Sequence, residues 1–257
     1  MGDKKTIQQI KEQIAASGLT NEEVSQLKLD SRKGVRTLLQ QYERELQKKR
    51  TLRMAFYEMR QWEQKCFAEG KTCIAGIDEA GRGPLAGPVV AAAVILPEGF
   101  YLEGLNDSKQ LSLAKREEFY TYITKTAATS TGLATNNEID ELNIYQATKL
   151  AMQRAVAELP MKPDHLLIDA MEIRETACTQ ESIIKGDQKS VSIAAASVIA
   201  KVSRDRLMKK IHKEFPVYEF SSNQGYGTKQ HLEAMEKHGV SPYHRQSFSP
   251  VKNLHFV

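Results

Sequence analysis

Acidic residues close three apolar segments of the chain. Asp78 ends CIAGID, Asp169 ends HLLID, and Asp187 follows SIIK through Gly186. We predict that these segments are buried strands, and ligand sites in open α/β sheets lie just outside strand ends. Carboxylates gathered at such an edge repel one another, which raises their pKa values and destabilises the fold. A divalent cation relieves that repulsion, and oxygen ligands without convergent His or Cys favour Mg²⁺ or Mn²⁺ over zinc.

Glu79 follows Asp78 directly, so its place in such a site depends on the backbone. In a continuing strand, neighbouring side chains point to opposite faces of the sheet. Gly81 and Gly83 permit a bend at this point, and ligation through the Glu79 carbonyl is a second option. A single strand-end acid often serves only to cap a helix, but three separate buried segments that each lead to an aspartate favour a shared site.

A glycine-rich segment, GRGPLAGP, follows the first acids at residues 81–88. Glycines let a backbone approach a ligand closely, and the exposed N–H and C=O groups then suit a sugar hydroxyl or a phosphate. The alternative is a tight loop that serves folding alone. A phosphate-binding P-loop needs a Lys after its last glycine, and a dinucleotide fingerprint needs GxGxxG, and neither pattern is present.

Other polar residues suit supporting roles near a phosphate backbone. Ser197, Lys201 and Arg204 share one face of a helix predicted over residues 192–215. They and Lys109 are candidate phosphate contacts, because such contacts position a duplex without reading its sequence; a solvated helix face is the alternative. Tyr226, between two glycines, suits base or sugar stacking or a simple turn. The histidines show no ligand spacing, and we expect His231 and His238 at the surface.

Strands alternating with helices are predicted to position these residues after Gly70. This order is typical of a sheet covered by helices. We predict strands over residues 73–78, 89–96, 130–134, 165–169 and 182–185, and helices over residues 113–126, 143–159, 192–215 and 231–238.

Residues 1–70 differ in character and are predicted to be helical throughout. Thr20 to Glu23 has the pattern of a capping box, and apolar residues from Val35 to Leu46 recur at helical spacing. This segment holds 14 Lys and Arg against 10 Asp and Glu, whereas residues 71–257 hold 22 of each, so the net charge of +4 comes from the N-terminal part. We therefore expect two parts, a basic helical extension over 1–70 and an α/β domain over 71–257.

The composition is that of a globular protein, with 41% hydrophobic and 26% charged residues among 257. No apolar stretch of about 18 residues is present, so no membrane span or membrane partner is expected. The start of the chain has no apolar signal region, and the three cysteines have no CxxC spacing, which argues against disulfides and structural zinc. We expect a monomer in the reducing cytoplasm.

Six motifs, in one order along residues 71–257, carry a family resemblance. The chain resembles the type 2 ribonucleases H, the ribonuclease HII family, which implies an RNase H-like fold with a mixed central sheet flanked by helices. The resemblance assigns metal binding and catalysis to Asp78, Glu79, Asp169 and Asp187. The motifs are GIDEAGRGPLAGPVVAAAVIL, LNDSKQLS, LLIDA, KGDQKSVSIAAASVIAKVSRDR, GYGTKQH and HRQSFSPV.

The same resemblance implies the substrate. Gly81, Arg82 and Gly83 would read the 2′-hydroxyl of a ribonucleotide at an RNA–DNA junction, and Tyr226 would stack on the following deoxyribose. The enzyme would hydrolyse the RNA strand of RNA–DNA hybrids and cut 5′ of single ribonucleotides in duplex DNA, leaving 3′-hydroxyl and 5′-phosphate ends. Two Mg²⁺ or Mn²⁺ ions held by the carboxylates would activate water and stabilise the departing 3′ oxygen.

Two other functions compete with this interpretation. A type 3 ribonuclease H has similar chemistry, but the Gly-Arg-Gly sequence and the helical extension argue for type 2. A non-catalytic nucleic-acid-binding module would bind hybrids without cutting them. Residues 1–70 have no counterpart in the compact core of the family. We hypothesise that they grip a duplex through counterion release, with a solvated helical face or a protein-contact module as alternatives.

Overall fold

The computed structural model describes residues 5–174 and 176–253. The chain divides into two compact units, Met1–Ala55 and Phe56–Val257, which are described separately. The division lies before the boundary expected after residue 70. The reason is that Phe56 and Met59 pack into the core beneath the sheet and Cys66 packs against Ile74 and Leu167.

The N-terminal unit is built from α1 (Ile7–Ala16), α2 (Asn21–Lys28) and the first part of α3 (Lys33–Met59). Both α1 and α2 begin with capping boxes, at Thr6 and at the predicted Thr20. A capping box satisfies amide groups at a helix start that have no partner within the helix. Ile10, Val35 and Leu39 form the small buried core of the unit.

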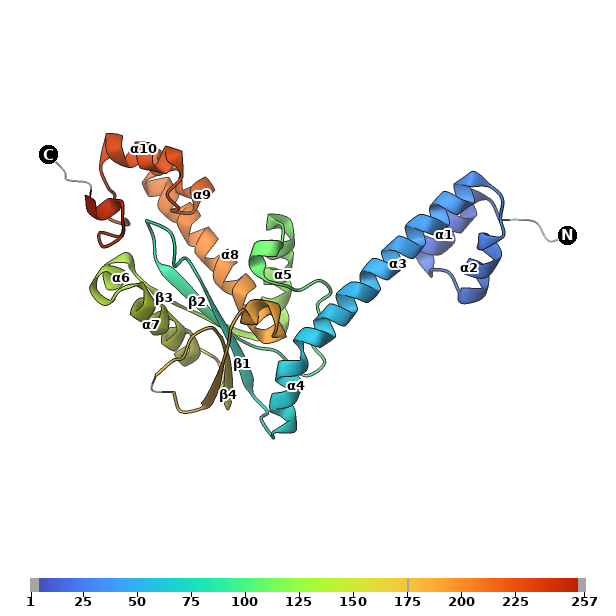
Figure 1. Ribbon diagram of the computed structural model, residues 1–257, viewed down its shortest axis with the longest axis horizontal. Coiled ribbons are helices and arrows are strands. Elements are labelled where there is room, and N and C mark those ends of the chain that lie inside the picture. The colour runs from blue at the N-terminus through green and yellow to red at the C-terminus, as the bar shows by residue number, and fades with distance from the viewer. Residues whose placement is uncertain (1–4, 175, 254–257) are drawn as a thin grey trace. The chain divides into compact units, whose positions relative to one another are not determined.

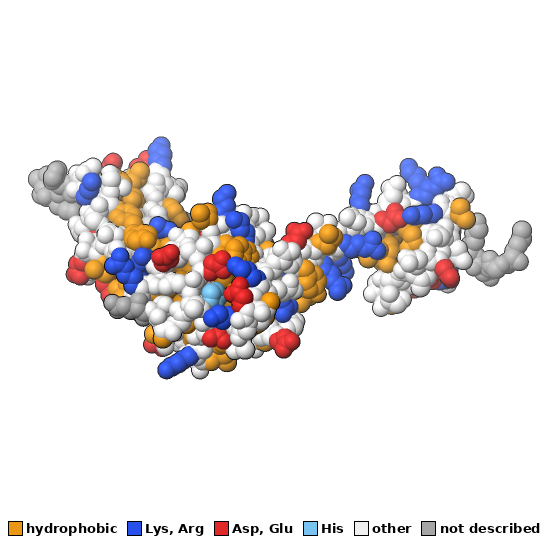
Figure 2. Space-filling model, turned by 60° about the horizontal axis from the view of Figure 1, so that its bottom comes forward, with side chains coloured by type: hydrophobic (Ala, Val, Ile, Leu, Met, Phe, Trp, Pro, Cys, Tyr) orange, Lys and Arg blue, Asp and Glu red, His pale blue; other side chains and the backbone are white. Residues whose placement is uncertain are grey.

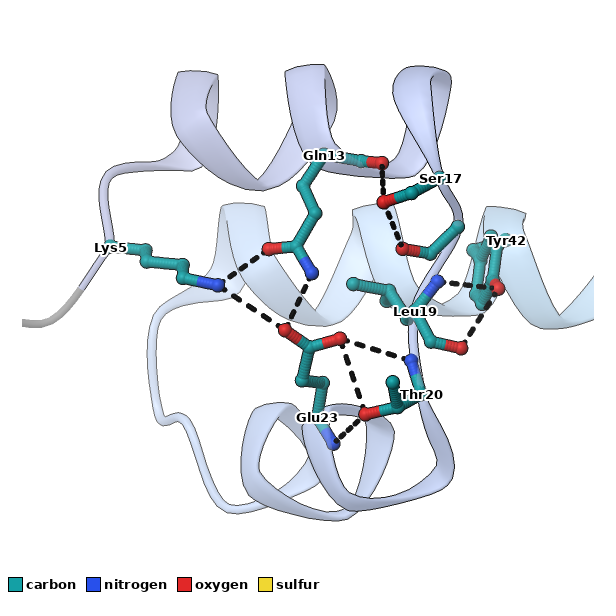
Figure 3. A network of polar contacts seen from close by, with 8 residues as sticks. Lys5, Gln13, Ser17, Leu19, Thr20, Glu23 and Tyr42 are labelled. Carbon is teal, nitrogen blue, oxygen red and sulfur yellow. Dashed lines mark hydrogen bonds and ion pairs between the residues drawn. The ribbon is translucent and has the colours of Figure 1, made fainter.

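A polar network joins the two short helices of this unit, as Figure 3 shows. The Glu23 carboxylate accepts from the amide of Thr20 at 3.0 Å, from Gln13 Nε2 at 2.5 Å and from Lys5 Nζ at 3.3 Å. These donors, first among them the Thr20 backbone, lower the pKa of Glu23 to about 2. The Tyr42 hydroxyl accepts from the amide of Leu19 at 2.9 Å and so fixes the turn between the helices to α3.

The second unit is organised around a mixed sheet of five strands in the order β3-β2-β1-β4-β5. β1 and β2 pair antiparallel, as do β2 and β3, whereas β1 pairs parallel with β4 and β4 with β5. A mixed α/β sheet was predicted and is confirmed. The strands are β1 (Ile74–Ala80), β2 (Val89–Ile95), β3 (Ala128–Ala134), β4 (His165–Asp169) and β5 (Thr179–Ile183).

Helices cover both faces of this sheet (Figure 1). On one face, α8 (Val191–Glu214) and α5 (Leu113–Thr126) pack against Ala92 and Val94. On the other, α7 (Ile144–Ala157) packs against Ala91 and Ala93. Because both faces are covered, every residue of β2 is buried, which explains its run of Val, Ala and Ile rather than an alternating pattern.

Small residues let α8 lie very close to the sheet. A Cβ at Gly76 of β1 would come within 2.1 Å of the carbonyl carbon of Ser192, so only glycine fits there. The first turns of α8 carry the run IAAAS, whose small side chains are all buried. This contact brings the residues of α8 up to the end of β1, where Asp78 lies.

Shorter elements complete the unit, and the structure shifts one predicted strand. The strand expected over 182–185 is β5 at Thr179–Ile183, so Asp187 lies on a separate 3-10 turn rather than just past a strand. In the described part of the chain, no helix is long and apolar enough to cross a membrane. The remaining elements are α4 (Gln61–Ala68), α6 (Asn136–Leu142), α9 (Phe220–Asn223), α10 (Lys229–His238), η1 (Ser108–Gln110), η2 (Gly186–Gln188), η3 (Pro216–Tyr218) and η4 (Val251–Asn253).

Candidate active site

Asp78 and Glu79 lie near the end of β1 on opposite faces of the sheet. β1 continues to Ala80, and Asp78 pairs with Ala92, on the α8 face, while Glu79 pairs with Ala91 on the other face. Burial, then the charges of Glu79 and Asp169, raises the pKa of Asp78 well above its usual value. Burial also raises the pKa of Glu79 despite the opposing charge of Arg82, and Asp169 contributes to that rise.

Asp169 and Asp187 come from the neighbouring strand end and from η2. Asp169 Oδ1 accepts a hydrogen bond from the amide of Gly186 at 2.7 Å, which ties η2 to the end of β4. Burial, then the charges of Asp107 and Asp169, raises the pKa of Asp187 to about 6. The four predicted acids therefore influence one another electrostatically at one end of the sheet, although they come from three separate segments.

Further polar groups surround these acids. Burial would lower the pKa of Lys109, but the nearby negative charges, first Asp107 and then Asp78, outweigh it and raise that pKa. Asp107 itself is buried and accepts from the amide of Lys109 at 2.9 Å. Asp107 was not chosen as a candidate from the sequence, although it stands two residues before Lys109 in the segment LNDSK. That polar segment gives no sign that Asp107 is buried, and it is the buried position that brings Asp107 close to Asp187.

The chemical type of these donors suits a hard divalent cation. All four acids offer oxygen, burial and like charge disfavour the ionised forms of Asp78, Glu79 and Asp187, and Glu79 Oε2 is buried without a hydrogen-bond partner. As the side chains stand, no three Asp, Glu, His or Cys residues within 5–174 and 176–253 are arranged to hold a metal ion. Glu79 turns to Arg82 at 3.3 Å and Asp169 to Gly186 at 2.7 Å, so joint coordination requires side-chain rotation.

The glycine-rich segment forms a fixed loop beside the acids. Gly81 has a φ of +97°, which favours glycine, and a Cβ there would come within 2.0 Å of Arg204 Nε. Arg82 and Gly83 are exposed. The loop thus presents its first residues to solvent while its glycines allow it to pack tightly against side chains beneath it.

Tyr226 lies next to this loop, and its role in substrate binding stays a prediction. Its side chain is 48% exposed, and its Cε1 atom lies 3.5 Å from where a Cβ on Gly83 would stand. The amide of Leu85 donates to the carbonyl of Gly225 at 2.8 Å, so the two loops are joined by their backbones. A partly exposed aromatic ring therefore stands beside an exposed residue of the glycine-rich loop.

Three positional expectations are wrong. Ser197 and Arg204 are 3% and 1% exposed, so they do not lie on a solvated helix face open to phosphates. Ser197 instead contacts Ser108 at 2.9 Å and lies beside Asp78, where its hydroxyl opposes the rise in the Asp78 pKa. His231, expected at the surface, is fully buried. Lys201 remains partly exposed and pairs with Asp205 at 2.7 Å; its role as a substrate contact stays a prediction.

Comparison with known proteins places this geometry in a family. The family model of ribonuclease HII matches residues 75–251, and that of the ribonuclease HII N-terminal domain matches residues 6–67. The chain is 51% identical over 247 residues to a ribonuclease HII of Oceanobacillus iheyensis, covering 96% of this chain and 95% of that one.

Solved structures agree on the fold. The ribonuclease H2 of Pyrococcus horikoshii superposes with a TM-score of 0.61 at 27% identity, covering 71% of this chain and 96% of that one. Bst-RNase HIII in complex with Mn²⁺ superposes with a TM-score of 0.55 at 18% identity, covering 71% and 68%, which shows the shared fold. With both family models matched and the relative covered over 95% of its length, this chain belongs to the ribonuclease HII family and is a ribonuclease H.

Proposed function

We propose that this ribonuclease H cuts the RNA strand of RNA–DNA hybrids and also cuts on the 5′ side of single ribonucleotides embedded in duplex DNA. The observation that carries the proposal is the adjacency of an acidic strand-end cluster and an exposed loop with an aromatic partner. The acids suit metal-assisted hydrolysis of a phosphodiester, and the loop suits recognition of a sugar.

In this proposal Asp78, Glu79, Asp169 and Asp187 hold Mg²⁺ or Mn²⁺, and two ions take part. Bound divalent ions supply Lewis-acid stabilisation of the phosphate and a water of lowered pKa. The side chains contribute the negative charge that attracts the ions. Burial and mutual repulsion raise the pKa values of Asp78, Glu79 and Asp187, and cation binding removes that repulsion. The Mn²⁺ complex of Bst-RNase HIII, a protein of the same fold, supports the choice of metal class. The products carry 3′-hydroxyl and 5′-phosphate ends.

Recognition is assigned to the loop and its neighbours. Gly81, Arg82 and Gly83 read the 2′-hydroxyl, and Tyr226 stacks on the next deoxyribose, where an extra hydroxyl would clash. Lys109, beside the acids and exposed, is placed to meet a phosphate of the strand being cut. Lys201 is a phosphate contact farther along α8. The three free cysteines fit a reducing compartment, and we place the enzyme in the cytoplasm.

One assay tests the proposal against its alternatives. The protein is incubated with a duplex DNA that carries one ribonucleotide and with a long RNA–DNA hybrid, each with Mg²⁺, with Mn²⁺ and with a chelator. We expect both substrates to be cut with either metal, the first on the 5′ side of the ribonucleotide, and neither with the chelator. Cleavage of the hybrid alone would indicate type 3 specificity, and binding without cleavage would indicate a non-catalytic module.

A further inference from the structure

Two arginine side chains are buried beneath the glycine-rich loop without an acidic partner. Arg204 is 1% exposed and Arg245 fully buried, and neither forms an ion pair with any Asp or Glu that the structure describes. Burial lowers the pKa of Arg204 to about 10 and that of Arg245 to about 9, so both stay charged at neutral pH. A buried unpaired charge is costly unless polar groups surround it, so the groups that do so here call for an explanation.

Arg245 is surrounded by carbonyl groups of the loop. Its Nη2 donates to the carbonyl of Gly81 at 2.6 Å, its Nη1 to that of Arg82 at 2.8 Å and its Nε to that of Gly87 at 2.9 Å. One guanidinium therefore fixes both ends of the loop. The Arg245 amide also donates to the carbonyl of Leu85 at 2.8 Å, which anchors the arginine itself.

Arg204 donates to carbonyl groups of both the glycine-rich loop and the segment before Tyr226. Its Nε donates to the carbonyl of Pro88 at 3.0 Å and its Nη2 to that of Ala86 at 3.1 Å. Its Nη1 donates to the carbonyl of Gln224 at 3.0 Å, two residues before Tyr226. Arg204 therefore joins the glycine-rich loop to the segment that carries the tyrosine.

These contacts determine which way the peptide amides face. In a trans peptide, the carbonyl of one residue and the amide of the next point in opposite directions. Because the carbonyls of Gly81 and Arg82 turn inward to Arg245, the amides of Arg82 and Gly83 turn away from it. Both residues are exposed, and neither amide donates to another residue in the described part of the chain. The exposed part of the loop thus carries two amide donors, and Gly83 lies beside the Tyr226 ring.

We propose that Arg245 and Arg204 are positioning residues that give the enzyme its selectivity for an isolated ribonucleotide. Arg245 aims the amides of Arg82 and Gly83 at the sugar, and Arg204 holds Tyr226 at the matching distance along the strand. This proposal rests on the proposed function, because it assumes that the loop reads a 2′-hydroxyl. Neither arginine touches the substrate.

Lysine is the informative replacement at both positions. It keeps the positive charge, but its single ammonium group replaces a planar fork that binds three carbonyls in fixed directions. A control exists on α7, which packs against the same sheet: Arg154 Nη1 donates to the carbonyl of Leu133 on β3 at 2.8 Å, and Arg154 contacts neither loop. Arg245→Lys, Arg204→Lys and Arg154→Lys are compared in the full chain, with thermal unfolding to confirm that each is folded.

The readout is kcat/KM on two substrates, the duplex with one ribonucleotide and the long hybrid. On the hybrid every register offers a 2′-hydroxyl, whereas on the single-ribonucleotide duplex the loop must find one position. The selectivity is the kcat/KM for the single-ribonucleotide duplex divided by the kcat/KM for the hybrid. We expect Arg245→Lys to lower this selectivity by about 100-fold, Arg204→Lys to lower it by about 10-fold, and Arg154→Lys to leave it unchanged. The effect is large because a site built to bond a hydroxyl discriminates strongly against its absence. Equal losses on both substrates, or none, would overturn the proposal.

A second measurement tests the proposal even if the arginine variants do not fold. In the full chain with Asp78→Asn, amide NMR signals of Arg82 and Gly83 are followed as either the single-ribonucleotide duplex or an all-DNA duplex of the same sequence is added. We expect these two amides to shift with the first duplex only, and identical behaviour with both would overturn the assignment. If the unaltered enzyme instead fails to cut the single-ribonucleotide duplex, the proposed function fails rather than the role of the arginines.

Discussion

Asp78 is a buried carboxylate whose neighbours disfavour its charge. Burial and the charges of Glu79 and Asp169 raise its pKa, so in the folded protein the ionised form is less favourable than in the unfolded chain. Folding stability from this group is therefore present at low pH and is lost as pH rises through the raised pKa. A residue that costs stability at neutral pH is typical of a site selected for chemistry.

Asp78→Asn should separate these two effects. We expect cleavage to fall by about 1000-fold, equivalent to about 4 kcal/mol of transition-state stabilisation that metal ions supply. Thermal stability should rise at pH 8, because the amide keeps the shape and removes the charge. Cleavage rates and thermal unfolding of the purified variant measure both.

The control for this variant is Asp164→Asn, remote from the site. Asp164 accepts from the amide of Thr72 at 2.7 Å, and donors including Thr72 lower its pKa although burial alone would raise it. We expect Asp164→Asn to lose stability and keep its cleavage rate. Full activity in Asp78→Asn would exclude the carboxylate from the site.

At the scale of single residues, the sequence indicated which residues are candidates for the site better than it indicated what surrounds each of them in the fold. Asp78, Asp169 and Gly81 could be chosen as candidates because a strand end or a glycine-rich turn is visible in the pattern of residues. Arg245 could not, because a buried arginine that binds backbone carbonyls looks like any surface arginine in the sequence. Its acceptors lie more than 150 positions away along the chain and meet it only in the fold.

At the scale of elements, a buried glutamate joins α4 to the start of α8. Glu63 Oε1 accepts from Ser190 Oγ at 2.5 Å, from Ser192 Oγ at 2.6 Å and from the Ser192 amide at 3.0 Å. The amide is one of the helix-start donors that lack partners within the helix. A carboxylate at a helix start is also favoured by the helix dipole. This contact fixes the helix that carries Ser197 and Arg204.

Glu63→Ala should therefore act on stability. Leaving buried donors unpaired costs about 1–3 kcal/mol each, so we expect the free energy of unfolding to fall by roughly 3 kcal/mol, as measured by urea denaturation. The cleavage rate of the folded fraction should change little. Glu58→Ala, an exposed position on α3, should leave stability within about 0.5 kcal/mol, and a similar loss in both variants would contradict the role given to Glu63.

Two buried histidines, His231 on α10 and His244 in the segment before η4, join these two parts of the chain. The Ser241 amide donates to His244 Nδ1 at 2.8 Å, so His244 Nε2 carries the proton and donates to His231 Nε2 at 2.9 Å. His231 Nδ1 then donates to the carbonyl of Tyr226 at 2.8 Å. A proton added to His244 Nδ1 would break the hydrogen bond that this nitrogen accepts from the Ser241 amide. Burial, with the nearby His231, lowers the pKa of His244 to about 4.

Acid should therefore destabilise the protein through His244. The stability that the neutral ring provides is complete above its unfolded pKa of about 6.5 and is lost as pH falls toward about 4, which amounts to roughly 3 kcal/mol. Unfolding free energies between pH 7 and 4.5 should fall more steeply in the unaltered protein than in His244→Asn, which cannot titrate. His238→Gln, at an exposed position, should follow the unaltered protein; if His244→Asn does so as well, the pair does not titrate as described.

Element prediction succeeded where one pattern dominated and failed where tertiary contacts decided. The strand His165–Asp169 and the helix Leu113–Thr126 were predicted at their observed bounds, since each has clear apolar periodicity and a definite end. β5 was displaced because its sequence TQESI is mostly polar, and its position is set by parallel pairing with β4. His231 was misplaced because the rings that contact it, those of Tyr218, Phe220 and His244, come from the segments before and after its own helix.

At the scale of the whole molecule, charge is divided unevenly between the two units. Residues 1–55 hold 12 Lys and Arg against 7 Asp and Glu, a net charge of +5, whereas residues 56–257 hold 24 against 25, a net charge of −1. Figure 2 shows Lys and Arg side chains gathered on the N-terminal unit in that view. The catalytic unit must nevertheless bind a polyanion beside its own acids, so a basic appendage would supply the attraction that it lacks.

We expect the N-terminal unit to contribute affinity through counterion release. Lys48, Lys49 and Arg50 are consecutive exposed residues of α3, and changing all three to Gln leaves the helix its good formers. If each contacts one phosphate, the slope of log affinity against log salt should become shallower by about 2.7, since each contact contributes about 0.9. Affinity for a duplex with one ribonucleotide, measured from 50 to 200 mM salt with Ca²⁺ in place of Mg²⁺, gives both slopes.

The matched control changes three exposed lysines scattered over the catalytic unit, Lys125, Lys162 and Lys237, to Gln. This control removes the same net charge as the α3 variant. A general effect of charge would change the salt slope of both variants equally, whereas phosphate contacts on α3 would change the slope of the α3 variant alone. The cleavage rate at saturating substrate should be unchanged in both, because neither set lies at the acidic cluster. An unaltered slope in the α3 variant would leave the N-terminal unit as a protein-contact module or a solvated helical face.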